Sequence, residues 1–93
     1  MKIVINTCYG GFSLSNEAVE FFGVNSPYAD IDRQNSLLIE KVEEDPDWIS
    51  GTYARLRVIE IPEDITDFEI DNYDGLETVT YVLAGKIHHV PAY

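Results

Sequence analysis

The sequence contains few basic residues and a single cysteine. Six Lys and Arg stand against seventeen Asp and Glu, which gives a formal net charge of -11. A surface this negative repels phosphate backbones and anionic lipids, so we expect no direct contact with nucleic acid or a membrane. The lone cysteine, Cys8, has no partner for an internal disulfide, which is typical of a protein in a reducing compartment.

Long apolar runs are also missing. No stretch approaches the roughly 18 to 20 apolar residues that a membrane helix needs. The apolar start at residues 2–6 is too short for the core of a secretory signal, so we expect a cytoplasmic protein. Hydrophobic residues nevertheless make up 45 % of the chain, enough to predict one small folded domain over residues 1–93 rather than a disordered chain.

Four segments have the patterns of β-strands. A β-branched run at residues 2–6 predicts a buried, central strand. Residues 53–61 predict a second strand, in which the apolar positions change face, as in a strand with a bulge or one buried on both sides. Apolar and acidic residues alternate over residues 68–73, and a further strand over residues 76–82 follows the pair Asp74-Gly75. This pair readily adopts positive φ, so we predict a tight hairpin turn between the two strands. Residues 86–90 could add a short edge strand.

Two segments have helix signals. Ser15 is a candidate N-cap and Gly23 a candidate C-cap for the first helix. Asn35 is placed to cap a second helix over residues 36–44, and Pro46 ends it, with a local loop expected around residues 45–48. The order of elements predicts an α+β fold: a mixed or antiparallel sheet of about four strands with two short helices packed on one face.

A glycine-containing loop connects the first strand to the first helix. At that place in a fold, backbone N–H groups can hold an anion, but two adjacent glycines match neither the dinucleotide fingerprint nor the P-loop. A structural turn is therefore the favoured interpretation, and a small-ligand or nucleotide site is the alternative. The candidate ligand loop comprises Thr7, Cys8, Tyr9, Gly10, Gly11 and Phe12.

The residues that could support catalysis or metal binding form no recognisable motif. A nucleophilic Cys8 would need a base, for which His88 or His89 is a candidate only if the fold brings it close. Neighbouring strand residues face opposite ways, so the two imidazoles cannot easily share one metal ion. We therefore predict no catalytic residue, metal site or cofactor, and expect a protein that is not an enzyme.

The excess of acidic over basic residues is unevenly distributed, because residues 58–85 contain eight Asp and Glu and no Lys or Arg. Alternate carboxylates on one strand lie about 6.5 to 7 Å apart, similar to neighbouring phosphates on one DNA strand. This predicts a DNA-like anionic surface for a basic protein partner, although a solvated acidic face would have the same pattern. The candidate partner-binding residues are Asp64, Asp67, Glu69, Asp71, Asp74 and Glu77.

Four segments carry a resemblance to a known group of proteins. They are MKIVINTCYGGFSLS at residues 1–15, IDRQNSLLIEKVEE at 31–44, YARLRVIEIPEDI at 53–65 and NYDGLE at 72–77. Together they resemble a family of small uncharacterised proteins encoded by bacteriophages and prophages. The chain departs from the family pattern in its longer tail, which carries His88, His89 and Tyr93.

The resemblance implies expression inside a bacterial host cell, during infection or from a prophage. Small acidic proteins in that setting often act by binding a host protein. The expected function is therefore an accessory role in which the chain binds the basic surface of a host protein, with a nuclease of the host defence as a candidate target. The family assigns no activity, so the resemblance supplies no catalytic residue.

Overall fold

Three helices and five strands make up the part of the chain that the computed structural model describes, residues 1–90. Pro91 and Tyr93 of the tail lie outside this part. In chain order the elements are β1 (Lys2–Asn6), α1 (Asn16–Phe22), α2 (Ser36–Glu44), α3 (Pro46–Ile49), β2 (Leu56–Glu60), β3 (Asp67–Tyr73), β4 (Leu76–Leu83) and β5 (Lys86–Val90). Among the described helices, none is both long and apolar enough to cross a membrane.

The strands form two antiparallel sheets, which confirms the α+β class. β1 pairs with β2, and β3, β4 and β5 form a separate three-stranded sheet in that order. The fold thus has five strands in two sheets, where about four in one sheet were predicted. The expected β5 is present, and the prediction of a loop around residues 45–48 is wrong: Pro46 begins α3, because its fixed φ suits the first helical position.

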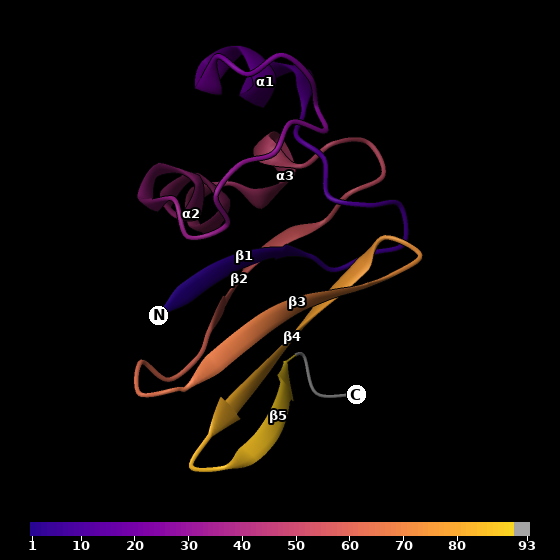
Figure 1. The fold of residues 1–93 in the computed structure, drawn as a ribbon. Coiled ribbons are helices and arrows are strands. Elements are labelled where there is room, and N and C mark those ends of the chain that lie inside the picture. The colour runs from indigo at the N-terminus through magenta and orange to yellow at the C-terminus, as the bar shows by residue number, and fades with distance from the viewer. Residues whose placement is uncertain (91–93) are drawn as a thin grey trace.

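The chain is arranged in three layers (Figure 1), with the helices on one side of β1 and β2 and the other sheet on the opposite side. β2 packs against the helices on one side and against the β3–β4–β5 sheet on the other. Leu56 and Val58 contribute to the cluster formed with the helices, whereas Ile59 and the following Ile61 contribute to the cluster formed with β3, β4 and β5. The change of face in the sequence therefore marks a strand covered on both sides, in regular register with β1.

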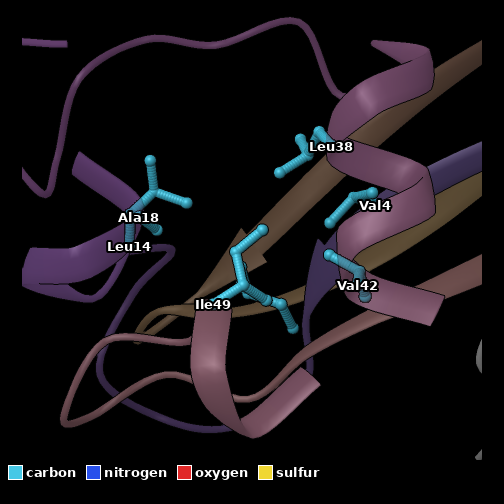
Figure 2. Close-up of a cluster of buried hydrophobic side chains, with 7 residues drawn as sticks. Val4, Leu14, Ala18, Leu38, Val42 and Ile49 are labelled. Carbon is cyan, nitrogen blue, oxygen red and sulfur yellow. The ribbon is translucent and has the colours of Figure 1, made fainter. Parts of the chain in front are cut away.

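Two apolar clusters hold the layers together. The cluster beneath the helices (Figure 2) consists of Val4, Leu14, Ala18, Leu38, Val42, Ile49 and Leu56. The second is built around Ile3, Ile5, Ile61 and Val79. Successive residues of β1 thus enter different clusters, which follows from the two-residue period of a strand. β1 is buried from Ile3 to Asn6, as expected for a central strand, although β2 is its one pairing strand among residues 1–90.

Local signals in the sequence fix the caps of α1 and α2 and the hairpin turn as predicted, whereas β2 is shorter than the strand predicted over residues 53–61. The Ser15 hydroxyl accepts a hydrogen bond from the Ala18 N–H, and Gly23 ends α1 with a φ of 66°. The Asn35 side chain accepts hydrogen bonds from the first turn of α2. In the predicted hairpin turn, Asp74 and Gly75 have φ angles of 50° and 90°.

A buried carboxylate completes the second edge of β1. Glu77 of β4 is only 4 % exposed, and its Oε1 accepts a 2.8 Å hydrogen bond from the Asn6 N–H. The Arg33 guanidinium donates to both oxygens of Glu77, at 2.6 and 2.9 Å, and lies 3.6 Å from the centroid of the Phe12 ring. The Arg33 carbonyl in turn accepts from the Val4 N–H. The network therefore connects β1 of one sheet to β4 of the other, and Arg33, in the loop before α2, contacts both strands.

Removing one member of this pair should greatly destabilise the protein. For Arg33→Ala, we expect the free energy of unfolding to fall by about 3–5 kcal/mol, because Glu77 would remain as an uncompensated buried charge. Urea unfolding followed by circular dichroism measures this loss. Glu43→Gln is the control, since it breaks the exposed Lys2–Glu43 ion pair and should cost no more than about 1 kcal/mol. Equal losses for the two variants would contradict a structural role for the buried pair.

Candidate interaction surface

Three exposed carboxylates form a row along β3. Asp67, Glu69 and Asp71 occupy alternate positions opposite Val82, Thr80 and Thr78 of β4, and we call these three residues the acidic row. The side of the sheet that carries the acidic row is its outer face, and the other side packs on the β1–β2 layer. Within residues 1–90, the Lys and Arg ion pairs are Lys2–Glu43, Arg33–Glu77 and Lys41–Glu44. None of them neutralises the acidic row.

The remaining candidate carboxylates divide into two groups. Asp64 and Asp74 are exposed, in the loop before β3 and in the hairpin turn. Glu77, in contrast, is buried on the inner face in its ion pair with Arg33, so it does not belong to the surface that a partner could contact. The alternation of β4 signals this position, because Glu77 shares a face with the fully buried Val79.

The histidine pair is split between the two faces of β5. His88 stacks on Tyr81 of the inner face, with ring centroids 5.0 Å apart. His89 is exposed, and its Nδ1 lies 3.1 Å from the Thr80 hydroxyl, which donates to the Asp71 carboxylate. Because that hydroxyl has only one proton, it accepts the hydrogen bond from His89. Among the described residues, no group of three or more His, Cys, Asp or Glu side chains could hold a metal ion.

The glycine loop is closely packed against two other segments. A Cβ atom at Gly75 would overlap the backbone nitrogens of Gly10 and Gly11, so the hairpin turn lies directly against this loop. A Cβ at Gly10 would likewise overlap the carbonyl of Tyr53. The Cys8 thiol donates to the same carbonyl at 3.0 Å, and its other partner among residues 1–90 is Asn6. Neither histidine takes part in these contacts.

The side chain of Asn6 links the three segments. Its Nδ2 donates to the carbonyls of Cys8 and Gly75, at 2.8 and 2.7 Å, and its Oδ1 accepts from the Arg55 N–H at 2.8 Å. Asn6 is completely buried at the end of β1. One amide group therefore fixes the positions of the glycine loop, the loop before β2 and the β3–β4 turn, and sequence reasoning gave it no such role.

Each of the three linked segments exposes one tyrosine. Tyr9 in the glycine loop is 66 % exposed, Tyr53 before β2 is 73 % exposed, and Tyr73 beside the hairpin turn is 71 % exposed. Tyrosines on rigid, glycine-rich loops are typical of protein-binding surfaces, because a rigid ring loses little conformational entropy on contact. The sequence indicates Tyr73 by its spacing, since it lies two residues beyond Asp71 and continues the acidic row on the same face.

Comparison with known proteins finds no match. No family model, no curated protein and no solved structure matches this chain.

The close approach of Gly75 to the glycine loop makes a measurable prediction. Gly75→Ala should lower the free energy of unfolding by about 1–2 kcal/mol, because the new side chain is held at a positive φ. The overlap of its Cβ with Gly10 and Gly11 should add a further loss of about 1–3 kcal/mol. Gly85→Ala is the matched control, because Gly85 also has a positive φ but no atom within 4 Å of an added Cβ. Thermal and urea unfolding should therefore show the larger loss at Gly75. A loss at Gly85 as large as that at Gly75 would contradict the close packing of these loops.

Proposed function

We propose that this chain is a binding protein that docks its acidic row on the basic surface of another protein. The observation that carries the proposal is the geometry of β3, where three carboxylates share one exposed face and no Lys or Arg pairs with them within residues 1–90. A net charge of -11 strengthens the field around this face. Such a field steers a positive partner towards it and raises the association rate.

The resemblance to bacteriophage and prophage proteins suggests the setting for the partner. We propose a protein of the bacterial host cell, and a defence nuclease as its class, because a nuclease must have a basic groove for the DNA backbone. A row of carboxylates spaced like phosphates would occupy that groove in place of DNA. The charge spacing and the exposure of β3 support this proposal.

A small-ligand site in the loop Thr7–Phe12 is the alternative function. The packing in this region gives it little support. The nitrogens of Gly10 and Gly11 face Gly75, and the Cys8 thiol and carbonyl are engaged by Tyr53 and Asn6. The largest exposed side chain of the loop is the ring of Tyr9, which is better suited to contact with another protein.

Neutralising the acidic row should weaken partner binding. The test compares the wild-type chain with the triple variant Asp67→Asn, Glu69→Gln and Asp71→Asn in affinity capture from a bacterial lysate, at low and high salt. We expect the wild-type chain to retain a basic protein at low salt and to release it as salt is raised, because screening weakens exposed charge contacts. With the captured protein purified, the triple variant should bind it at least about tenfold more weakly, a loss of roughly 1.4 kcal/mol.

The control variant removes the same number of negative charges from another part of the surface. Glu17→Gln, Glu20→Gln and Glu40→Gln remove three exposed carboxylates from α1 and α2, which lie on the opposite side of the β1–β2 layer from β3. This variant should bind almost as well as the wild type. If both variants lose affinity equally, only the net charge matters and the acidic row is not the site. For a captured nuclease, DNA cleavage should fall as the chain is added.

A further inference from the structure

Two exposed tyrosine rings and one carboxylate line a cleft at the hairpin end of the outer face. The cleft has a volume of about 320 Å³ and is lined by Tyr9, Asp71, Asn72, Tyr73, Leu76 and Thr78. Five of these residues come from β3 and β4, and Tyr9 reaches the cleft from the glycine loop. We call it the tyrosine cleft.

The groups in the tyrosine cleft suit a guanidinium better than an ammonium group. A guanidinium is planar, weakly hydrated and able to stack on aromatic faces while its N–H groups pair with a carboxylate. An ammonium group is a compact, strongly hydrated charge and gains less from two aromatic rings. The cleft should therefore favour arginine over lysine, although both carry one positive charge.

The same combination of groups already holds a guanidinium inside this protein. Arg33 stacks over the Phe12 ring at 3.6 Å and donates to both carboxylate oxygens of Glu77. The second cation–π contact among the described residues joins Lys41 and Phe21. Within that part of the chain, the rings of Tyr9 and Tyr73 stay open to a cation from another molecule.

Asp71 is held at the side of the cleft. The Thr80 hydroxyl donates to Oδ2 of Asp71 and accepts from His89, and this restricts the carboxylate without neutralising it. The hydrogen bonds within residues 1–90 leave its other oxygen, Oδ1, free to accept from a ligand. The positions of Asn6 and Gly75 fix the two loops that present the rings, so little entropy should be lost when a ligand enters.

We propose that the tyrosine cleft receives an arginine side chain of the partner protein. The inference rests on the proposed function, because it specifies the basic surface that meets the acidic row. Asp67, Glu69, Asp71 and Tyr73 occupy alternate positions of β3, so the row leads directly to the cleft. A basic segment of the partner lies along β3 with its positive side chains on the row and one arginine in the cleft.

Two short peptides of equal charge test the preference without the partner. Tetra-arginine and tetra-lysine, each blocked at both ends, are titrated into the ¹⁵N-labelled protein and followed by NMR. We expect tetra-arginine to bind several-fold more tightly and to shift the amide signals of Tyr9, Tyr73 and Leu76 most. Equal affinities, or shifts confined to residues remote from the cleft, would overturn the proposal.

Substitutions of the tyrosines show whether the rings carry the preference. Tyr9→Leu and Tyr73→Leu should each reduce the affinity for tetra-arginine by about 2- to 5-fold and leave that for tetra-lysine nearly unchanged. Tyr73→Phe keeps an aromatic face and should retain the preference. Tyr28→Leu is the matched control, because Tyr28 is equally exposed but lines a different cleft. Unchanged preference in both cleft variants, or the same loss in Tyr28→Leu, would overturn the proposal.

The outcomes separate this inference from the proposed function. Asp67→Asn with Glu69→Gln should weaken both peptides alike and keep the arginine preference, because these changes remove charge and leave the rings. If that variant keeps full affinity for the partner while the cleft variants lose it, the proposed function fails and the cleft remains. If the row proves essential and the peptides show no preference, only the cleft proposal falls. Concentration-dependent shifts at Tyr9 and Tyr73 without peptide would instead show that a second copy fills the cleft.

Discussion

The fold depends on one carboxylate buried between its two sheets. Glu77 pairs with both terminal nitrogens of Arg33 and accepts a hydrogen bond from the backbone of β1. Its carboxylate thus takes the place of a backbone carbonyl of an adjacent strand. Burying this charge is costly, and the arrangement is tolerable only because every partner is present. The side-chain link closes the edge of β1 and sets the position of the β3–β4 hairpin.

The surface features follow from that constraint. With Glu77 on the inner face of β4, the period of the strands directs Asp67, Glu69 and Asp71 to the outer face of β3. Asn6, next to the same network, fixes the glycine loop against the hairpin turn. The acidic side chains and tyrosine rings are thus held on segments that are already fixed in place. This favours binding, because these segments lose little conformational entropy on contact with a partner.

Local chemistry in the sequence predicted the elements well but not their assembly. The caps at Ser15 and Asn35 and the Asp-Gly turn depend on neighbouring residues alone, and all three are present. The change of face in β2 was also informative, since it marks a strand covered on both sides. The division into two sheets was not predictable, because the groups at the second edge of β1, Arg33 and Glu77, lie 44 residues apart and Arg33 is in a loop without periodicity. For the same reason Glu77 was assigned to the surface, although its shared face with Val79 was a usable signal.

The late position of Glu77 in the chain has a consequence for biosynthesis. β1 is made first, yet its pairing strand begins at Leu56 and the carboxylate that covers its other edge arrives only with Glu77. Contacts so distant in sequence are slow to form, and a ribosome adds only about 5–20 residues per second. Until Glu77 is made, the second edge and the Ile3–Ile5 face of β1 lack their native contacts with β4, and chaperones could shield them. Synthesis that stopped before the hairpin would leave β1 paired with β2 but without the Glu77 carboxylate at its other edge.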